Sequence, residues 1–98
     1  MIYFAALEIP PLRKWQKSEK MNGKRSYIFY LPRDAAFGIH PGWKRVGRRN
    51  VFSGYSLVIW EGVVGGSEKR ILGEYKRASD AVEIARGVWE QELESRFF

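Results

Sequence analysis

The residues with the clearest capacity for chemistry are four cations within six positions, in the stretch Trp43-Lys44-Arg45-Val46-Gly47-Arg48-Arg49. Arginine guanidinium groups bind phosphates or read guanine edges in the DNA major groove, and aromatic rings stack on bases. Lys69 and Arg70 extend this set if a hairpin brings them alongside. The alternative is a solvated basic loop, which would still bind polyanions without specificity. The residues expected to contact nucleic acid are Trp43, Lys44, Arg45, Arg48, Arg49, Tyr55, Trp60, Lys69 and Arg70.

No catalytic residue, metal site or cofactor is expected. The chain has no cysteine, which excludes disulfides, thiolate zinc sites and cysteine nucleophiles. The one histidine, His40, has no second imidazole or thiolate to complete a zinc site, and no G-x-S-x-G motif supplies a nucleophile. Gly65-Gly66-Ser67 lacks the Gly-Lys-Ser/Thr of a Walker loop, so a hairpin turn is the better interpretation. We therefore expect a structural or solvated histidine and a protein that is not an enzyme.

The charge of +6 is unevenly distributed along the chain. Residues 1–49 hold eleven lysines and arginines against three acidic residues, whereas residues 79–98 hold two against five. A basic body followed by an acidic helix attracts polyanions, so nucleic acid, acidic proteins and anionic lipid head groups are the candidate partners. Charge alone does not choose among them, and the oligomeric state stays open.

The composition predicts one folded domain over residues 1–98, since 45% of the residues are apolar and 15% aromatic. Within it, residues 43–97 are expected to form a sheet-plus-helix unit and residues 1–42 an N-terminal extension contributing one or two strands. No apolar stretch approaches the roughly 20 residues of a membrane span. Residues 1–7 are apolar but too short for a signal sequence, so no membrane association and a cytoplasmic location are expected.

The apolar patterns predict an α+β fold, with an antiparallel sheet of about four or five strands and one C-terminal amphipathic helix packed on one face. The glycines and prolines between residues 33 and 54 predict mostly loop there, with a short strand at 44–49. The helix is expected to begin after an N-cap at Ser79 and to bury Val88 and Trp89. A helical turn or solvated loop is expected at 12–17, a turn at Asn22-Gly23, and strands at 2–7, 26–31, 55–64 and 69–75.

The strand at 55–64 is apolar on both faces, so the helix can cover only part of its side chains. Leu57 and Ile59 alternate with Val58 and Trp60. One face is expected to pack on the helix. The other is either covered by the N-terminal half of the chain or exposes aromatic rings to a partner.

The C-terminal half resembles the Apetala-type and phage-integrase-type DNA-binding domains over about residues 43–97. The matching residues are Lys69-Arg70-Ile71-Leu72-Gly73-Glu74-Tyr75, followed by Ala78-Ser79-Asp80-Ala81-Val82 and Ala85, with Gly47-Arg48-Arg49 and Gly54-Tyr55 near the first two strands. The resemblance implies three antiparallel strands, one packed helix, and a sheet face opposite the helix that lies in the DNA major groove. It favours a non-enzymatic binder of duplex DNA, of the kind carried by phages or mobile elements.

Two alternatives from other classes stay open. Ser53-Gly54-Tyr55-Ser56-Leu57-Val58-Ile59 is similar to the central strand of RelE-type ribonuclease toxins, which cleave RNA with Lys, Arg and Tyr side chains. Pro10, Pro11 and Gly23 disfavour the helical hairpin with which those toxins open. The other alternative is a small phage or plasmid protein that inhibits a host protein by surface contact.

Overall fold

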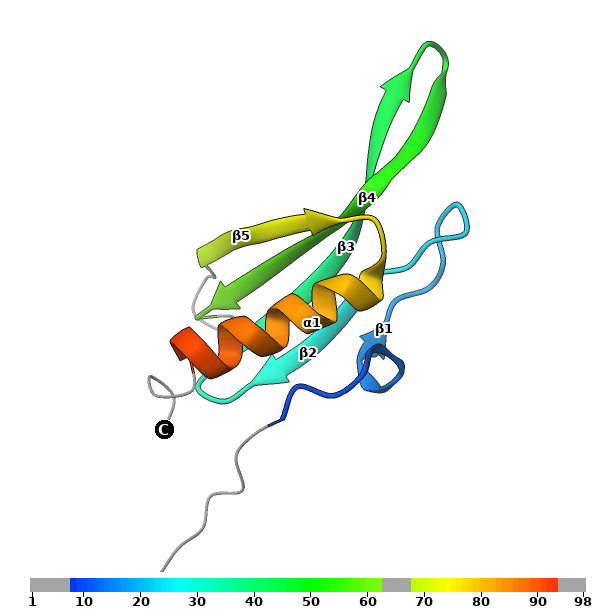
Figure 1. The fold of residues 1–98 in the computed structure, drawn as a ribbon. Coiled ribbons are helices and arrows are strands. Elements are labelled where there is room, and N and C mark those ends of the chain that lie inside the picture. Colours follow the sequence, from blue (N-terminus) through cyan, green and yellow to red (C-terminus); the bar gives the residue numbers. More distant parts are fainter. Residues whose placement is uncertain (1–7, 63–67, 94–98) are drawn as a thin grey trace, which may run out of the picture.

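The computed structural model describes residues 8–62 and 68–93, which form an α+β domain with a five-stranded antiparallel sheet in the order β1-β2-β3-β4-β5 (Figure 1). The predicted fold class is confirmed. None of the described helices is long and apolar enough to cross a membrane. In chain order the elements are the 3-10 helix η1 (Leu12–Lys14), β1 (Gln16–Lys17), β2 (Tyr27–Leu31), β3 (Ala35–Val46), β4 (Arg49–Glu61), β5 (Glu68–Tyr75), α1 (Ala78–Val88) and the π-helical η2 (Trp89–Leu93).

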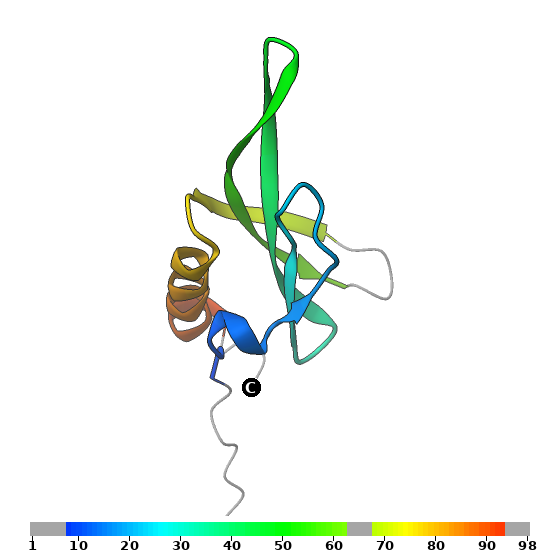
Figure 2. The ribbon, with the colours of Figure 1, turned by 90° about the vertical axis from the view of Figure 1, so that its right-hand side faces the viewer.

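Helix α1 lies across one face of the sheet, as the two perpendicular views show (Figures 1 and 2). Successive side chains of a strand point to opposite faces, so Phe37 and Ile39 of β3 face the helix together with Leu57 and Ile59 of β4. All four are fully or almost fully buried. Helix α1 contributes small residues and η2 large ones, namely Ala78, Ala81, Val82 and Ala85 from α1 and Trp89 and Leu93 from η2.

The N-terminal segment closes one side of this core. Trp15 is 2% exposed, and its ring centroid lies 5.7 Å from that of Phe29 and 6.4 Å from that of Phe37. Its indole Nε1 donates a hydrogen bond to the carbonyl oxygen of Pro10 at 2.9 Å, so the one polar atom of the ring is satisfied. Arg86 of α1 donates through Nε to the carbonyl oxygen of Ile9, which ties the segment to the helix.

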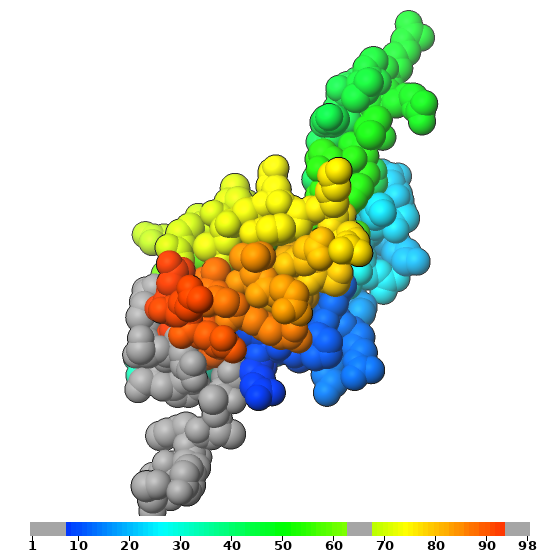
Figure 3. All heavy atoms as spheres, viewed as in Figure 1, coloured from blue at the N-terminus to red at the C-terminus, as the bar shows by residue number. Residues whose placement is uncertain are grey.

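The longest strands of the sheet, β3 and β4, continue far beyond the helix as a two-stranded ribbon (Figures 1 and 3). Their pairing runs from Ala35 opposite Glu61 to Val46 opposite Arg49. We call residues 43–52, whose side chains are exposed except for Phe52, the arm. β3 crosses the boundary that the sequence suggested between residues 42 and 43.

The prediction of mostly loop over residues 33–54 was wrong. Glycines of this segment lie in the turn and at the bulge of a long two-stranded ribbon. Gly47 is the first residue of the two-residue turn at the tip, and its φ of +62° is the value that a type II′ hairpin turn requires there. A bulge next to Gly42 shifts the register of the pair, so Gly42 opposes Gly54 and Trp43 opposes Phe52. Closely spaced glycines therefore mark a turn and a bulge here, and they do not end the strands.

The other secondary-structure predictions were partly confirmed. The strand at 26–31 and the Asn22-Gly23 turn are confirmed, with positive φ at both turn residues. The predicted N-cap was wrong: the helix begins at Ala78, Arg77 occupies the cap position, and Ser79 lies inside the first turn. Residues 12–17 form η1 followed by β1. The strand predicted at 2–7, the Gly65-Gly66 turn and the end of the helix beyond Leu93 lie outside the described residues.

Replacing Trp89 with Ala should lower the free energy of unfolding by about 3–5 kcal/mol, because the side chain is 1% exposed at the centre of the core. Ile84→Ala on the outer face of the same helix is the matched control, since Ile84 is 41% exposed and should cost less than about 1 kcal/mol. Urea denaturation of the two variants measures both values. Equal effects would contradict the core position of Trp89.

Candidate nucleic-acid interface

The arm carries four exposed cations, Lys44, Arg45, Arg48 and Arg49. No acidic residue occurs between His40 and Trp60. Within residues 8–62 and 68–93 none of the four forms an ion pair, and Arg45 uses only its Nε, which donates to the carbonyl oxygen of Gly47 at 3.2 Å. The arm therefore presents its positive charge uncompensated at the end of a narrow projection (Figure 3).

The cross-strand register divides the arm into two faces, because directly opposed residues project to the same side. Trp43 opposes Phe52 and Arg45 opposes Asn50, which gives one face an aromatic pair and an Arg–Asn pair. On the other face Lys44 opposes Val51 and Val46 opposes Arg49. Val46 is 53% exposed and Val51 37% exposed, so each face combines polar and apolar contact groups.

A row of aromatic rings in contact connects the arm to the part of the sheet that the helix covers. The Trp43 and Phe52 ring centroids are 5.7 Å apart, and those of Phe52 and Tyr55 are 5.0 Å apart, both in edge-to-face geometry. The Lys24 ammonium lies 4.4 Å from the centroid of Phe52, a cation–π contact from the neighbouring turn. These contacts hold the arm where no helix covers it.

Tyr55 belongs to the core. It is 8% exposed, and burial, with a smaller contribution from nearby Tyr27, raises its pKa above the ordinary value. We therefore do not include Tyr55 in the candidate interface, because its ring is buried and packs on Phe52.

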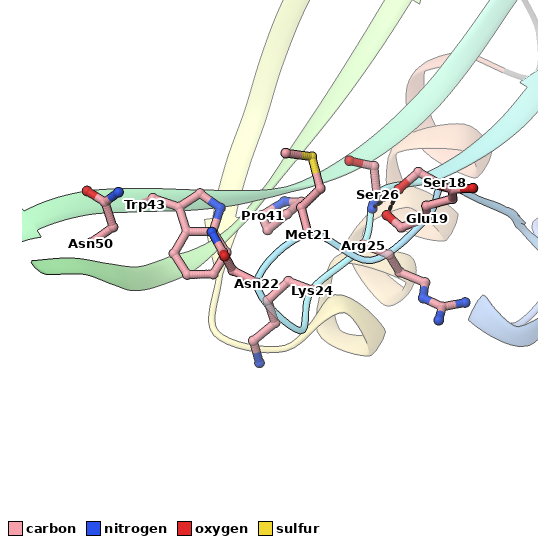
Figure 4. A pocket seen from close by; sticks show the side chains of 10 residues that line it. All are labelled: Ser18, Glu19, Met21, Asn22, Lys24, Arg25, Ser26, Pro41, Trp43 and Asn50. Atoms are coloured by element: carbon pink, nitrogen blue, oxygen red, sulfur yellow. Dashed lines mark hydrogen bonds between the residues drawn. The ribbon is translucent and has the colours of Figure 1, made fainter.

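A groove of about 420 Å³ lies between the end of the arm nearest the rest of the sheet, which we call its root, and the turn at Asn22-Gly23 (Figure 4). The turn is closed by two backbone hydrogen bonds between Met21 and Lys24, of 2.7 and 3.1 Å. At its base, Ser18 Oγ accepts a hydrogen bond from the backbone N–H of Ser26. The lining residues are Ser18, Glu19, Met21, Asn22, Lys24, Arg25, Ser26, Pro41, Trp43 and Asn50.

Lys69 and Arg70 do not join the arm. They pair with Trp60 and Ile59, eleven and ten residues from Arg49 along β4, which at about 3.3 Å per residue is roughly 35 Å from the tip. Arg70 faces the helical side, where its guanidinium lies 4.0 Å from a carboxylate oxygen of Glu92. The idea that the second hairpin brings these two cations alongside the first four was wrong.

The sheet face opposite the helix is largely apolar. Tyr30 and Ile71 are 55% and 62% exposed there, and Trp60 lies across Gly38 so closely that a Cβ on Gly38 would collide with the indole. His40 packs against the same indole with ring centroids 5.1 Å apart. This is the face that the integrase-type resemblance places in DNA, yet the arm carries the denser positive charge.

His40 lies on this face in strand β3, where it is half-buried and not in a loop. Its Nε2 is shielded from solvent and has no hydrogen-bond partner in the described part of the chain. Burial, and then the positive charge of Lys69, lower the pKa of His40 below 6.5. Among residues 8–62 and 68–93, no group of three or more His, Cys, Asp or Glu side chains is placed to hold a metal ion.

Two groove cations were missed from the sequence, Lys24 and Arg25. The pattern that could have found them is the Asn-Gly turn, which predicts a tight hairpin with these cations directly after it. The position of that hairpin beside the arm depends on the pairing of β2 with β3, which no local pattern encodes.

The pKa of His40 predicts a loss of stability in acid. A folded-state pKa below the unfolded value means that the unfolded chain binds the proton more tightly, so the melting temperature should fall as the pH drops below about 6.5. His40→Gln removes this titration. The variant should therefore lose less stability than the wild type between pH 7 and pH 5.5, as measured by thermal melts. Parallel curves for the two proteins would contradict the assignment.

Comparison with known proteins gives the chain no family. No protein-family model matches it, and no curated protein or solved structure matches it. The interface described above therefore rests on the geometry and charge of this chain's own residues.

Proposed function

We propose that this protein binds duplex DNA through the arm, without catalysing a reaction. The observation that supports this most directly is the arm itself. It carries four exposed cations that form no ion pair within residues 8–62 and 68–93, and no acidic residue occurs between His40 and Trp60. Phosphate contacts by lysine and arginine supply most of the affinity of proteins for nucleic acid.

The shape of the arm favours the major groove of DNA as its binding site. Two antiparallel strands lie about 4.8 Å apart, and the B-DNA major groove, about 12 Å wide and 8.5 Å deep, admits a two-stranded ribbon. The major groove of an RNA duplex is too deep and narrow for side chains to read. A ribbon whose tip contacts no other element in the described part of the chain therefore suits duplex DNA.

The two faces of the arm suit different parts of that groove. Arginine recognises guanine and asparagine recognises adenine through paired hydrogen bonds, and Arg45 and Asn50 lie directly opposite each other on one face. Lys44 and Arg49 on the other face, with Arg48 at the tip, are suited to phosphates. Trp43 lies next to Arg45 on the first face and adds an aromatic surface at the root.

An acidic protein surface is the competing partner, because it would contact the same cations. The test below separates it from nucleic acid. No contact among the described residues favours a ribonuclease activity.

We expect duplex DNA to bind at low salt and to be released steeply as salt rises. If each of the four arm cations displaces one condensed counterion, the slope of log affinity against log salt is near −3.6, or about 150-fold weakening from 50 to 200 mM. Fluorescence anisotropy with a labelled duplex measures it. Failure to bind duplex DNA at 50 mM salt would contradict the proposal and would favour a protein partner.

Removing two arm cations should change that slope by a defined amount. In Arg48→Ala/Arg49→Ala the slope should flatten by about two units if both side chains contact phosphate. The matched control is Lys69→Ala/Arg70→Ala, which removes the same charge roughly 35 Å from the tip and should leave the slope nearly unchanged. Equal flattening in both double variants would show that net charge, and not the arm, governs binding.

A further inference from the structure

The groove beside the arm combines two residues of the arm, Trp43 and Asn50, with residues of the Asn22-Gly23 turn that the duplex-binding proposal does not use. Its lining combines the broad ring of Trp43, which is 37% exposed, with the Met21 side chain, which is 75% exposed. Two amides, Asn22 and Asn50, line it from its two sides, the turn and the arm. Its volume of about 420 Å³ lies within the range of sites that hold one small ligand.

The cations of the groove belong to the turn. Lys24 is held near the arm by its contact with the Phe52 ring, whereas in Figure 4 the guanidinium of Arg25 points away from Trp43, toward the end of the groove that carries Glu19. Glu19 is the one acid among the ten lining residues, and in Figure 4 it lies near Ser18, away from Trp43. The end of the groove near Trp43 is therefore positive.

Figure 4 shows the Trp43 indole projecting from the arm toward the turn that carries Asn22. An exposed indole is a platform on which any base can stack, amides donate to and accept from base edges, and ammonium or guanidinium groups hold phosphate. A paired base stays inside the duplex stack and cannot reach such a platform, so the base has to be unpaired.

The groove and the arm share Trp43 and Asn50, which connects the two sites physically. From Trp43 to the tip at Gly47 is four residues, or roughly 13 Å. This is about the length of four base-pair steps in a duplex. A strand that leaves the duplex bound by the arm therefore passes the groove within a few nucleotides.

We propose, building on the proposed function, that the groove binds one unpaired nucleotide of a strand whose adjoining duplex is held by the arm. The base stacks on Trp43, and the phosphate lies against Lys24. The preferred target is thus duplex DNA that continues into a single strand.

The test compares a blunt duplex with the same duplex carrying a single-stranded extension of a few thymidines, both titrated by fluorescence anisotropy. Stacking of one base predicts about tenfold tighter binding of the extended duplex. In Trp43→Ala the ratio of the two affinities should fall to about one, whatever the affinity for the blunt duplex. The matched control is Tyr30→Ala, which removes an exposed aromatic ring from the opposite sheet face and should keep the full ratio.

A second variant keeps the indole in place. Met21→Glu puts a carboxylate into the groove at a highly exposed position, so it should leave the fold intact and lower the ratio by repelling the phosphate. Equal affinity of the wild type for both DNAs, or an advantage that survives in both groove variants, would overturn the groove proposal and leave the arm's role standing. Absence of duplex binding at 50 mM salt would overturn both.

Discussion

The pairing of β3 with β4 is the interaction on which the rest of the structure depends, because one ladder passes through two environments. Near Ala35 and Glu61 it is the centre of the sheet and lies under the helix, where Phe37 and Leu57 are fully buried. Beyond Gly42 it has no neighbouring strand among the described residues, and its side chains are mostly exposed. The buried half supplies the hydrophobic stabilisation that fixes its own register. The exposed half continues the pairing, with its register shifted at the bulge next to Gly42, and has no core of its own.

The charges follow the same division. Four exposed cations lie on the arm and Lys24 on the neighbouring turn, whereas Glu90 and Glu92 lie on η2 at the end of the helix farthest from the arm, where Glu92 is close to Arg70 (Figure 1). A molecule whose positive charge is densest at one end is attracted to a polyanion by that end. The arm would therefore lead in any encounter with nucleic acid, and the helix would remain on the outside.

Local patterns were sufficient to predict the fold class, the helix with its buried Trp89, and the strand that became β2, because each depends on the periodicity of apolar residues. They failed between residues 33 and 54, where glycine and proline spacing describes a turn and a bulge as well as it describes a loop. The cations of the arm were identified without knowledge of the ribbon that carries them. The separation of Lys69 and Arg70 from the arm, and the groove next to Lys24, depend on which strands pair, and that is a property of the whole chain.

An arm that is ordered before binding loses less conformational entropy when it meets its partner. A ribbon that became ordered only on contact would lose backbone and side-chain freedom at that moment, and the affinity would fall by the same free energy. Here the row of aromatic rings of Trp43, Phe52 and Tyr55, with Lys24 on the Phe52 face, connects the exposed half of the ribbon to the buried half. The same contacts hold one wall of the groove in place. A change at Phe52, a side chain that lines neither the groove nor the tip, would therefore alter the stability of the arm root and the affinity of both proposed sites together.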